Sequence, residues 1–501
     1  MPRVPTAEVR FIIYLCMSAC KETWSTGNSP HTTSIHILDN DSLLNVFYLY
    51  RPFLLGEEAH DVQIRFRGGE PWVGERWWHR LAHVCQRWRN LILGSASYLG
   101  LCLVCTHGTP VADMLAHSPP LPLVIDYHEF NITGEDEDAI ILALAQRDRV
   151  RRIRFKLPVL KLQKLIMAID GEYPILEYLI LGYPSKDKRT VLTLSETLHA
   201  PHLRLLGIAC SIPIRFQLLT TAVGLVTFNL ALYHPSTYFQ PSVLLQSLSL
   251  MPQLEILMIY FHFAVPNRDV ERQLMRAPVP THVTLPNLRI FALKAVSAYS
   301  EAVLSRITAP RLEIFEIRYP KQLTFSVPQL LQFMGRTETL RFDRAEFRFH
   351  NERVYVRVNP PETNTSMAAF CIVVECWHLD WQVSSVAQIS NALSQIFSPV
   401  EHLTLSHNVH SQSSEEHNEV DCSEWRRLLR SFSSVKTLRV HRRLVGELSR
   451  CLRWEDGEHH LGLLPELQEL TYSGRSSAGA GFTSFIDARR NAGRPVTLIK
   501  S

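Results

Sequence analysis

Apolar residues recur along this chain in a short pattern, Leu-x-x-Leu-x-Leu with apolar substitutions. The last two leucines stand two residues apart, which is the spacing of one face of a β-strand. Helix-compatible stretches separate the copies: in residues 240–250, Pro241 suits a first helical turn and leucines recur with helical spacing. Each unit therefore predicts a helix, a turn and a strand. Clear copies begin at Leu176, Leu203, Leu225, Leu254, Leu288, Leu312, Val400, Val435 and Leu467, and weaker ones at Val150 and Thr337.

A proline stands one or two residues ahead of several copies, at Pro201, Pro252, Pro286 and Pro310. Proline fixes its own φ and lacks an N–H donor, so it ends the preceding helix and directs the chain into the strand. One such unit cannot bury its apolar face alone, and neighbouring units must stack with parallel strands along one side. Over residues 150–475 the chain resembles leucine-rich repeats of the long, irregular kind. The predicted fold class is α/β, with an irregular leucine-rich-repeat solenoid and a parallel sheet.

One region interrupts this rhythm. Residues 341–350, 353–358 and 367–376 read as three strand-like runs, separated by the turn-forming residues Asn, Pro and Thr. We expect either a hairpin insertion or a strand-rich variant of the repeat at residues 341–376.

The N-terminal part of the chain predicts helices instead. In residues 35–55 an apolar lead-in and a cluster of Asp and Asn precede an apolar helix that stops near Pro52. Residues 77–93 predict a single second helix with one apolar face, and residues 98–105 alternate like a strand at the first edge of the array. The apolar face of the second helix consists of Leu81, Val84, Cys85, Trp88 and Ile92.

The order of apolar residues in these two helices resembles an F-box. The motif runs Ile37-Leu38, Asp41-x-Leu43-Leu44-x-x-Phe47 and then Leu81-x-x-Val84-Cys85-x-x-Trp88. Together with Asp380-Trp-Gln-Val-Ser-Ser385, it is similar to the large fungal group of F-box-like proteins with degenerate leucine-rich repeats. The resemblance implies a Skp-type adaptor as partner and, through it, a cullin scaffold. The residues that it places at adaptor contacts or in the F-box core are Ile37, Leu38, Leu44, Phe47, Leu81, Val84, Cys85 and Trp88.

The chain departs from the F-box pattern at Asp39, where many F-boxes have a proline, and in the longer, polar linker 56–76. The alternative interpretation is that the two helices only form the polar-faced cap that the end of a solenoid requires. The expected domains are an N-terminal extension (1–33), the F-box-like module (34–97), the repeat array (98–475) and a C-terminal tail or cap (476–501).

Composition narrows the class of protein. Apolar residues make up 46% and charged residues 20% of the chain, a balance that supports a packed core. The net charge of +4, from 52 basic and 48 acidic residues, is too even for the basic face of a nucleic-acid binder. The apolar segment 11–20 is too short to span a membrane. The ten cysteines are scattered, which is typical of thiols in the cytosol or nucleus.

The sequence contains no recognisable catalytic or ligand-binding motif. The chain has no phosphate-binding glycine loop, and no nucleophile, base and orienting group can be assembled by spacing. Cys102 and Cys105 have zinc-like spacing but lack a second matching pair. The acidic run 135–138 precedes an apolar helix, where the helix dipole stabilises acids. We therefore expect neither an enzyme nor a bound cofactor or metal.

The basic run 147–156 allows two interpretations. Arg151, Arg152 and Arg154 would meet a phosphorylated or acidic target if they face the concave side of the array. Alternatively, they form a solvated strand edge, because they alternate with residues that the repeat uses as core.

The sequence as a whole predicts the substrate-recognition subunit of a ubiquitin ligase, with a protein target held by exposed strand positions. The alternatives are a repeat scaffold with no ligase association and, as a third class, an enzyme built on the array. By alternation along the strands, the candidate target-binding residues are Arg204, Glu255, Arg289, Glu313, Glu316, Lys436 and Arg439.

Overall fold

The computed structural model describes residues 38–50, 77–128, 132–183, 190–213, 216–263, 282–337, 342–360, 368–408, 420–441, 443–452, 462–473 and 480–500. The chain divides into two compact units, one formed by 1–186 with 192–205 and the other by 187–191 with 206–501. Both units are α/β, and their strands are mostly parallel. The expected N-terminal extension, 1–33, lies outside the described residues.

Unit 1 combines a group of short helices with a small parallel sheet of order β1-β2-β3-β4. Its elements are α2 (Asn40–Tyr50), α4 (Trp77–Ala82), α5 (Gln86–Gly94), α6 (Ala96–Leu99), β1 (Leu103–Cys105), α7 (Val111–His117), β2 (Leu123–Tyr127), α8 (Gly134–Leu144), β3 (Val150–Lys156), α9 (Val159–Met167) and β4 (Tyr178–Gly182).

Two sequence predictions in this unit are wrong in detail. The single helix expected at 77–93 is broken into α4 and α5, because Cys85 adopts an extended conformation and its Sγ accepts the N–H of Trp88 at 3.5 Å as an N-cap. The strand expected at 98–105 begins only at Leu103. Tyr98 and Leu99 belong to α6, and the residue that follows and caps this helix, Gly100, has the left-handed conformation, with φ of 61°.

Unit 2 contains a long sheet of order β5-β6-β7-β9-β11-β14-β13-β12-β15-β16-β17-β18, with β8 and β10 paired separately. Its strands are β5 (Leu205–Ala209), β6 (Thr227–Leu232), β7 (Ile256–Phe261), β8 (Val283–Thr284), β9 (Ile290–Lys294), β10 (Ile307–Thr308), β11 (Ile314–Pro320), β12 (Arg344–His350), β13 (Arg353–Asn359), β14 (Phe370–Glu375), β15 (His402–His407), β16 (Thr437–His441), β17 (Glu469–Ser473) and β18 (Thr497–Lys500). Its α-helices are α10 (Phe216–Thr221), α11 (Pro241–Leu248), α13 (Ser297–Leu304), α14 (Pro328–Arg336), α15 (Leu379–Ala392), α16 (Ser394–Phe397), α17 (Cys422–Arg430), α18 (Leu444–Cys451) and α20 (Thr483–Asn491).

The repeated sequence pattern coincides with the strands. Each clear copy contains a strand that starts two residues after its first apolar residue, as β7 does after Leu254 and β16 after Val435. The weaker copy at Val150 forms β3, whereas the one at Thr337 runs into residues outside the described part. The prolines explain the turn before the strand. Leu254 N donates to Met251 O at 3.2 Å, so Pro252 occupies the second position of a hydrogen-bonded turn, where its fixed φ fits.

The strand-rich region after residue 341 has the three predicted strands. β12 and β13 pair antiparallel around a turn at 351–352, and β13 also pairs antiparallel with β14. β14 pairs parallel with β11, while β12 pairs parallel with β15. The hairpin is thus built into the sheet, and β13 is the strand that reverses direction.

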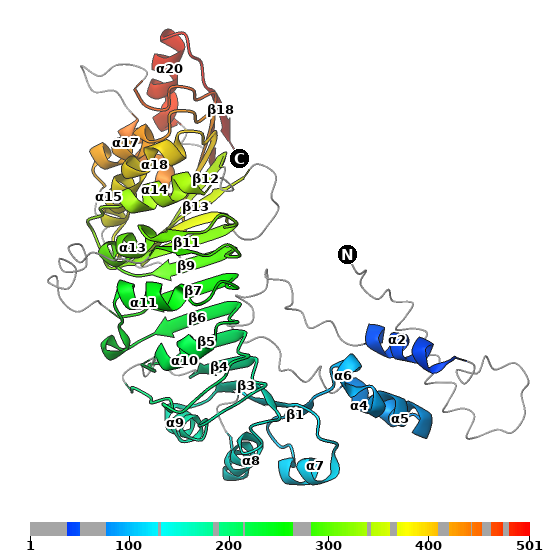
Figure 1. Ribbon diagram of the computed structural model, residues 1–501. Coiled ribbons are helices and arrows are strands. Elements are labelled where there is room, and N and C mark those ends of the chain that lie inside the picture. The colour runs from blue at the N-terminus through cyan, green and yellow to red at the C-terminus, as the bar shows by residue number, and fades with distance from the viewer. Residues whose placement is uncertain are drawn as a thin grey trace, which may run out of the picture. The chain divides into compact units, whose positions relative to one another are not determined.

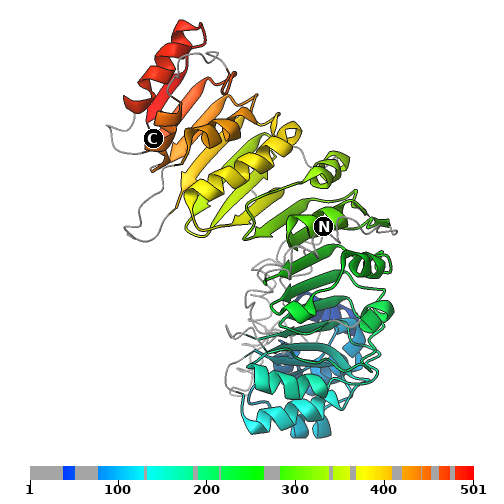
Figure 2. The same ribbon diagram turned by 90° about the vertical axis from the view of Figure 1, so that its left-hand side faces the viewer.

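Helices α11, α13, α14, α15, α17 and α18 lie on one face of the unit 2 sheet (Figure 1), and the view turned by 90° shows them in front of the strands (Figure 2). Along β11, β12 and β13 every second residue is buried. The buried set faces the helices, as the contact of Phe349 with Trp425 of α17 shows, with ring centroids 5.6 Å apart. The alternate residues lie on the opposite face, which we call the open face.

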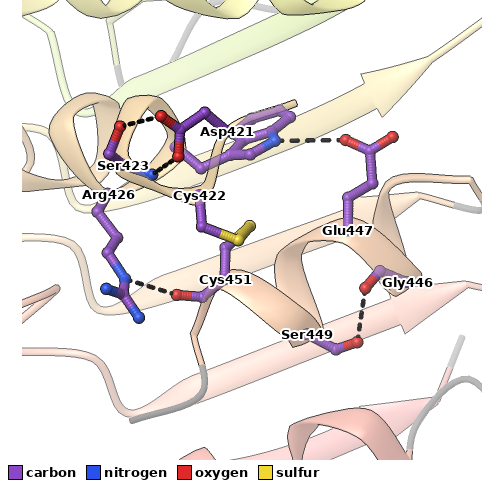
Figure 3. Close-up of a disulfide and its surroundings, with 9 residues drawn as sticks. Asp421, Cys422, Ser423, Arg426, Gly446, Glu447, Ser449 and Cys451 are labelled. Atoms are coloured by element: carbon purple, nitrogen blue, oxygen red, sulfur yellow. Dashed lines mark hydrogen bonds between the residues drawn. A yellow bond between two sulfur atoms is a disulfide. The ribbon is translucent and has the colours of Figure 1, made fainter. Parts of the chain in front are cut away.

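The expectation that the cysteines are thiols needs one correction. Cys422 and Cys451 form a disulfide between α17 and α18, with Cα atoms 4.7 Å apart (Figure 3). Stacking of successive helices brings the two residues together, although 29 positions separate them in the sequence. Cys85, Cys102, Cys105, Cys210, Cys371 and Cys376 are free thiols. No helix in the described part of the chain is long and apolar enough to cross a membrane.

Candidate functional site

The helical module of unit 1, formed by α2, α4, α5 and α6, has a small aromatic core. Phe47 of α2 packs edge-on against Trp88 of α5, with ring centroids 4.8 Å apart, and both are buried. Leu43 and Phe47 are four residues apart and so lie on one face of α2. The module also contacts the chain beyond it, because Trp78 Nε1 donates to Cys102 O at 3.2 Å.

The residues predicted from the F-box resemblance occupy three kinds of position. Phe47, Leu81 and Trp88 are buried in the module. Half-buried positions are held by Leu44, Val84 and Cys85, and Leu38 is exposed. Ile37 lies outside the described residues. The buried members hold the helices together, so contact with a partner would fall to the others.

Three large side chains that the motif does not contain are exposed on the module. Tyr48 and Leu49 of α2 and Tyr98 of α6 have exposed fractions of 47%, 45% and 52%. The rings of Tyr48 and Tyr98 lie 5.5 Å apart, and Tyr98 Oη donates to Asn45 Oδ1 at 3.1 Å. We call these three residues the α2 patch. The sequence pattern does not identify this patch, because the exposure of its residues depends on how the helices pack.

Asp39, the departure from the F-box pattern, has a clear structural role. Its carboxylate accepts the backbone N–H of Ser42 at 2.8 Å and the Ser42 hydroxyl at 2.9 Å, which caps the first turn of α2. These hydrogen bonds from Ser42 lower the pKa of Asp39. A proline at this position could not make them, so this chain starts α2 by a different device.

Five of the predicted target-binding residues lie one residue before a strand and not within it. These residues are Arg204, Glu255, Arg289, Glu313 and Lys436, ahead of β5, β7, β9, β11 and β16. Backbone hydrogen bonds stack three of them along the edge of unit 2: Arg289 N donates to Glu255 O, and Glu313 N to Arg289 O, both at 2.8 Å. Alternation missed this because the strand pairing begins one residue later.

The charges along this edge are largely neutralised within the chain. Arg289 Nε and Nη2 donate to the two carboxylate oxygens of Glu313 at 2.8 and 2.9 Å, and Lys436 Nζ donates to Glu401 Oε1 at 2.7 Å. Exposed pairs of this kind contribute little to stability, about 0 to 1 kcal/mol each. Arg204 lies in unit 1, which includes residues 192–205.

Glu316 and Arg439 lie within strands, as alternation predicted. Glu316, in the middle of β11, accepts from Arg318 Nε at 2.5 Å and from Tyr260 Oη at 3.4 Å. Burial raises the pKa of Tyr260, and the nearby Glu316 charge adds to the shift. Next to this group, Lys294 Nζ donates to Glu375 Oε1 at 2.6 Å, and burial lowers the pKa of Lys294 despite that pairing. These side chains are therefore paired with one another.

Arg439, in contrast, borders a hollow on the open face of unit 2. The register aligns Arg344 of β12 with His402 of β15, and Thr404 of β15 with Arg439 of β16. Thr404 and Thr437 are short and lie between longer side chains on neighbouring strands, so a space of about 290 Å³ remains above them. We call this space the threonine hollow. Its lining residues are Arg344, Ala345, Glu346, Asn359, His402, Leu403, Thr404, Thr437 and Arg439.

The basic run of unit 1 does not offer unpaired arginines to a target. Arg154 Nε donates to Asp126 Oδ1 at 2.6 Å, and Arg151 Nε lies 2.9 Å from Glu177 Oε2. The Arg152 guanidinium lies 4.6 Å from the centre of the Tyr178 ring. Each of the three has a partner on a neighbouring strand or, for Arg151, on the residue just before one, and spacing alone does not reveal these partners.

The acidic run at the start of α8 is also structural. Asp136 accepts from Thr133 N at 2.8 Å and Gly108 N at 3.1 Å, and its Oδ2 lies 2.8 Å from His107 Nδ1. Burial alone would raise the pKa of Asp136, but these hydrogen bonds outweigh it and lower the pKa to about 2. Among the residues that the structure describes, no three His, Cys, Asp or Glu side chains are grouped to hold a metal ion.

No family model and no curated protein matches this sequence. The α2 patch of unit 1 and the open face of unit 2 are therefore the features from which a function can be inferred.

Proposed function

We propose that this protein is a non-catalytic substrate-recognition subunit of a Skp/cullin/F-box-type ubiquitin ligase. In this proposal the helical module is an F-box that docks on a Skp-type adaptor, and the adaptor joins it to a cullin scaffold. The strands and helices that follow form a leucine-rich-repeat solenoid, and its open face holds a protein target.

The observation that carries the proposal is the α2 patch beside the ordered F-box motif. Phe47 and Trp88 fill the core of the module, yet Tyr48 and Tyr98 remain exposed in contact with each other, and Leu49, the residue after Tyr48, is exposed as well. Full burial of a large apolar side chain contributes about 1.5 to 3 kcal/mol. A subunit that covers this patch therefore gains free energy on the scale of a stable contact, as adaptor binding requires.

The alternative is a repeat protein that binds partners without any ligase. The hydrogen bond from Trp78 Nε1 to Cys102 O favours it, because it fixes the module next to the edge strand β1, where a cap would lie. Adaptor binding distinguishes the two functions, because a helical module that only caps the sheet is not expected to bind the adaptor.

The test is co-expression of the full chain with a fungal Skp-type adaptor, followed by affinity purification and size-exclusion chromatography. We expect the adaptor to co-elute, and Leu49→Glu combined with Tyr98→Glu to abolish co-elution, because each change places a charge in the contact. The matched control is Leu160→Glu in α9, where the leucine is 86% exposed and outside the module. Trp88 is unsuitable because its loss would unfold the module.

Two outcomes would contradict the proposal: no co-elution with the unmodified chain, or equal co-elution of the double variant. Circular dichroism of each variant shows whether the chain still folds.

The proposal places the protein in the cytosol or nucleus, where such ligases act. The six free thiols in the described part of the chain agree with a reducing compartment, and the Cys422–Cys451 disulfide is an exception to that trend.

A further inference from the structure

The threonine hollow has an unbalanced positive charge. Arg344 and Arg439 are exposed on opposite sides of it, with His402 between them along the sheet. The one acidic side chain in the lining, Glu346, is occupied by Arg348, whose Nε donates to Glu346 Oε1 at 2.5 Å. Arg439 forms no ion pair with any residue that the structure describes, and Arg344 only a loose one, at 3.8 Å from Asp343. An anion could therefore enter without displacing a close ion pair.

The other lining groups are suited to an oxyanion. Thr404 and Thr437 carry hydroxyl groups that can donate hydrogen bonds, and they form the floor of the hollow between the two arginines. Guanidinium groups bind carboxylate and phosphoryl oxygens through parallel hydrogen bonds, which are stronger than those between neutral groups. Strands hold all of these residues, so the donors are arranged before a ligand arrives.

From this arrangement we propose that the threonine hollow binds an oxyanion, carboxylate or phosphoryl, on a side chain of an extended polypeptide. The inference rests on the proposed function insofar as that polypeptide is the target, but the site itself requires no ligase.

The lining favours a polypeptide over a free small molecule. Pockets for small molecules are mostly apolar, whereas Ala345 and Leu403 are the only apolar residues in this lining.

The experiment measures binding of the full chain to three fluorescent degenerate peptide pools by anisotropy. The pools are identical except for a central phosphoserine, glutamate or glutamine. We expect one or both of the charged pools to bind more tightly than the glutamine pool, and their order identifies the oxyanion. Arg344→Gln and Arg439→Gln should each weaken binding of the charged pool by about 10-fold, because each removes charge-assisted hydrogen bonds.

Two further variants isolate the site. Arg311→Gln, an exposed arginine of the same unit outside the hollow, is the matched control and should leave binding unchanged. Thr404→Met fills the hollow but keeps both arginines, so it should weaken binding at least as strongly as either arginine variant. General attraction to a positive surface would leave Thr404→Met unaffected.

The proposal is overturned if the three pools bind equally, if the arginine variants bind like the unmodified chain, or if Thr404→Met has no effect. Inorganic phosphate that binds as tightly as the phosphoserine pool would overturn the polypeptide assignment. The adaptor assay is independent: loss of peptide binding with intact adaptor co-elution rejects only the hollow, and the reverse result rejects only the ligase role.

Discussion

Glu301 of α13 shows how one residue can make stability depend on pH. Its carboxylate accepts the backbone N–H groups of Gln329 and Leu330 at 2.5 and 3.0 Å, and so caps α14 from a neighbouring helix. Val327, the residue before α14, makes no side-chain cap. Burial raises the pKa of Glu301 from 4.5 to about 7, although the two hydrogen bonds act in the opposite direction.

A carboxyl group with a raised pKa binds more protons in the folded chain than in the unfolded one. The free energy of unfolding therefore decreases as the pH rises from 4.5 to about 7, and stability from this group is complete only below that window. We expect Glu301→Gln to remove a pH-dependent term in the free energy of unfolding on the order of 3 kcal/mol. Urea unfolding at several pH values measures it, and a pH profile parallel to that of the unmodified chain would reject this role.

Gln382 of α15 connects the ends of two strands, β12 and β14, that are separate in the sequence. The side chain is buried, and its Nε2 donates to His350 O at the end of β12, at 2.7 Å, and to Cys376 O after β14, at 2.9 Å. Gln382→Met keeps the volume but leaves both carbonyl groups without this donor, so we expect a loss of about 1 to 3 kcal/mol in unfolding free energy.

Gln388→Met in the same helix is the control, because Gln388 makes one exposed hydrogen bond, to Leu323 O. Urea unfolding should show a clearly smaller loss for this control. Equal losses would mean that the buried hydrogen bonds of Gln382 are not the cause.

At the scale of elements, α17 and α18 are joined by more than apolar packing. Besides the disulfide, Trp425 Nε1 donates to Glu447 Oε2 at 3.3 Å and Arg426 Nε to Cys451 O at 2.9 Å (Figure 3). These contacts connect two successive helices on the helix side of the unit 2 sheet. The C-terminal part of unit 2 therefore has a covalent constraint that the sequence pattern gave no reason to expect.

Closing a loop between residues 29 apart stabilises the folded chain by about 3 to 4 kcal/mol in the chain-entropy description. We expect Cys422→Ala with Cys451→Ala to lose an amount of this order in unfolding under oxidising conditions. A reducing agent should lower the stability of the unmodified chain to a similar level and leave the double variant unchanged. If the reducing agent has no effect on the unmodified chain, the bond does not contribute.

At the scale of the whole molecule, aromatic side chains connect neighbouring strands and helices of unit 2. Phe315 of β11 lies 5.5 Å from Phe291 of β9, 5.6 Å from Phe370 of β14 and 5.2 Å from Phe333 of α14, measured between ring centroids. In a stack of similar strand-and-helix segments, each segment is stabilised chiefly by the segments on either side of it. Loss of packing in one segment should therefore destabilise only its neighbours.

Phe315→Ala leaves a cavity in this cluster and should cost about 3 to 5 kcal/mol. Hydrogen exchange followed by mass spectrometry should show lost protection in β9, β11 and β14, with β1 to β4 of the other unit unchanged. Phe315→Leu, which keeps more of the volume, is the control and should show a smaller effect. Uniform loss of protection in both units would contradict local coupling.

The two candidate surfaces could be predicted only in part. The resemblance to an F-box predicted a docking module, but four residues of the motif form the core, and the exposed α2 patch follows from how α2 and α6 pack. Alternation identified Arg439 as exposed, but the hollow beside it needs Arg344, which lies far away in the sequence. The number of residues between β12, β15 and β16 does not show how these strands align. Sequence spacing therefore could not predict that Arg344 and Arg439 line the same hollow.

The sequence by itself determined the α/β class, the positions of most strands and the turns before them. Those features depend on the local apolar period and on proline, which act within a few residues. Tertiary structure decided the break at Cys85, the reversal of β13, the Cys422–Cys451 bond and the partners of the basic run. Each of these features depends on which segments pack against one another. That packing is determined by burial of the apolar surface of the whole chain, which cannot be read from a local sequence pattern.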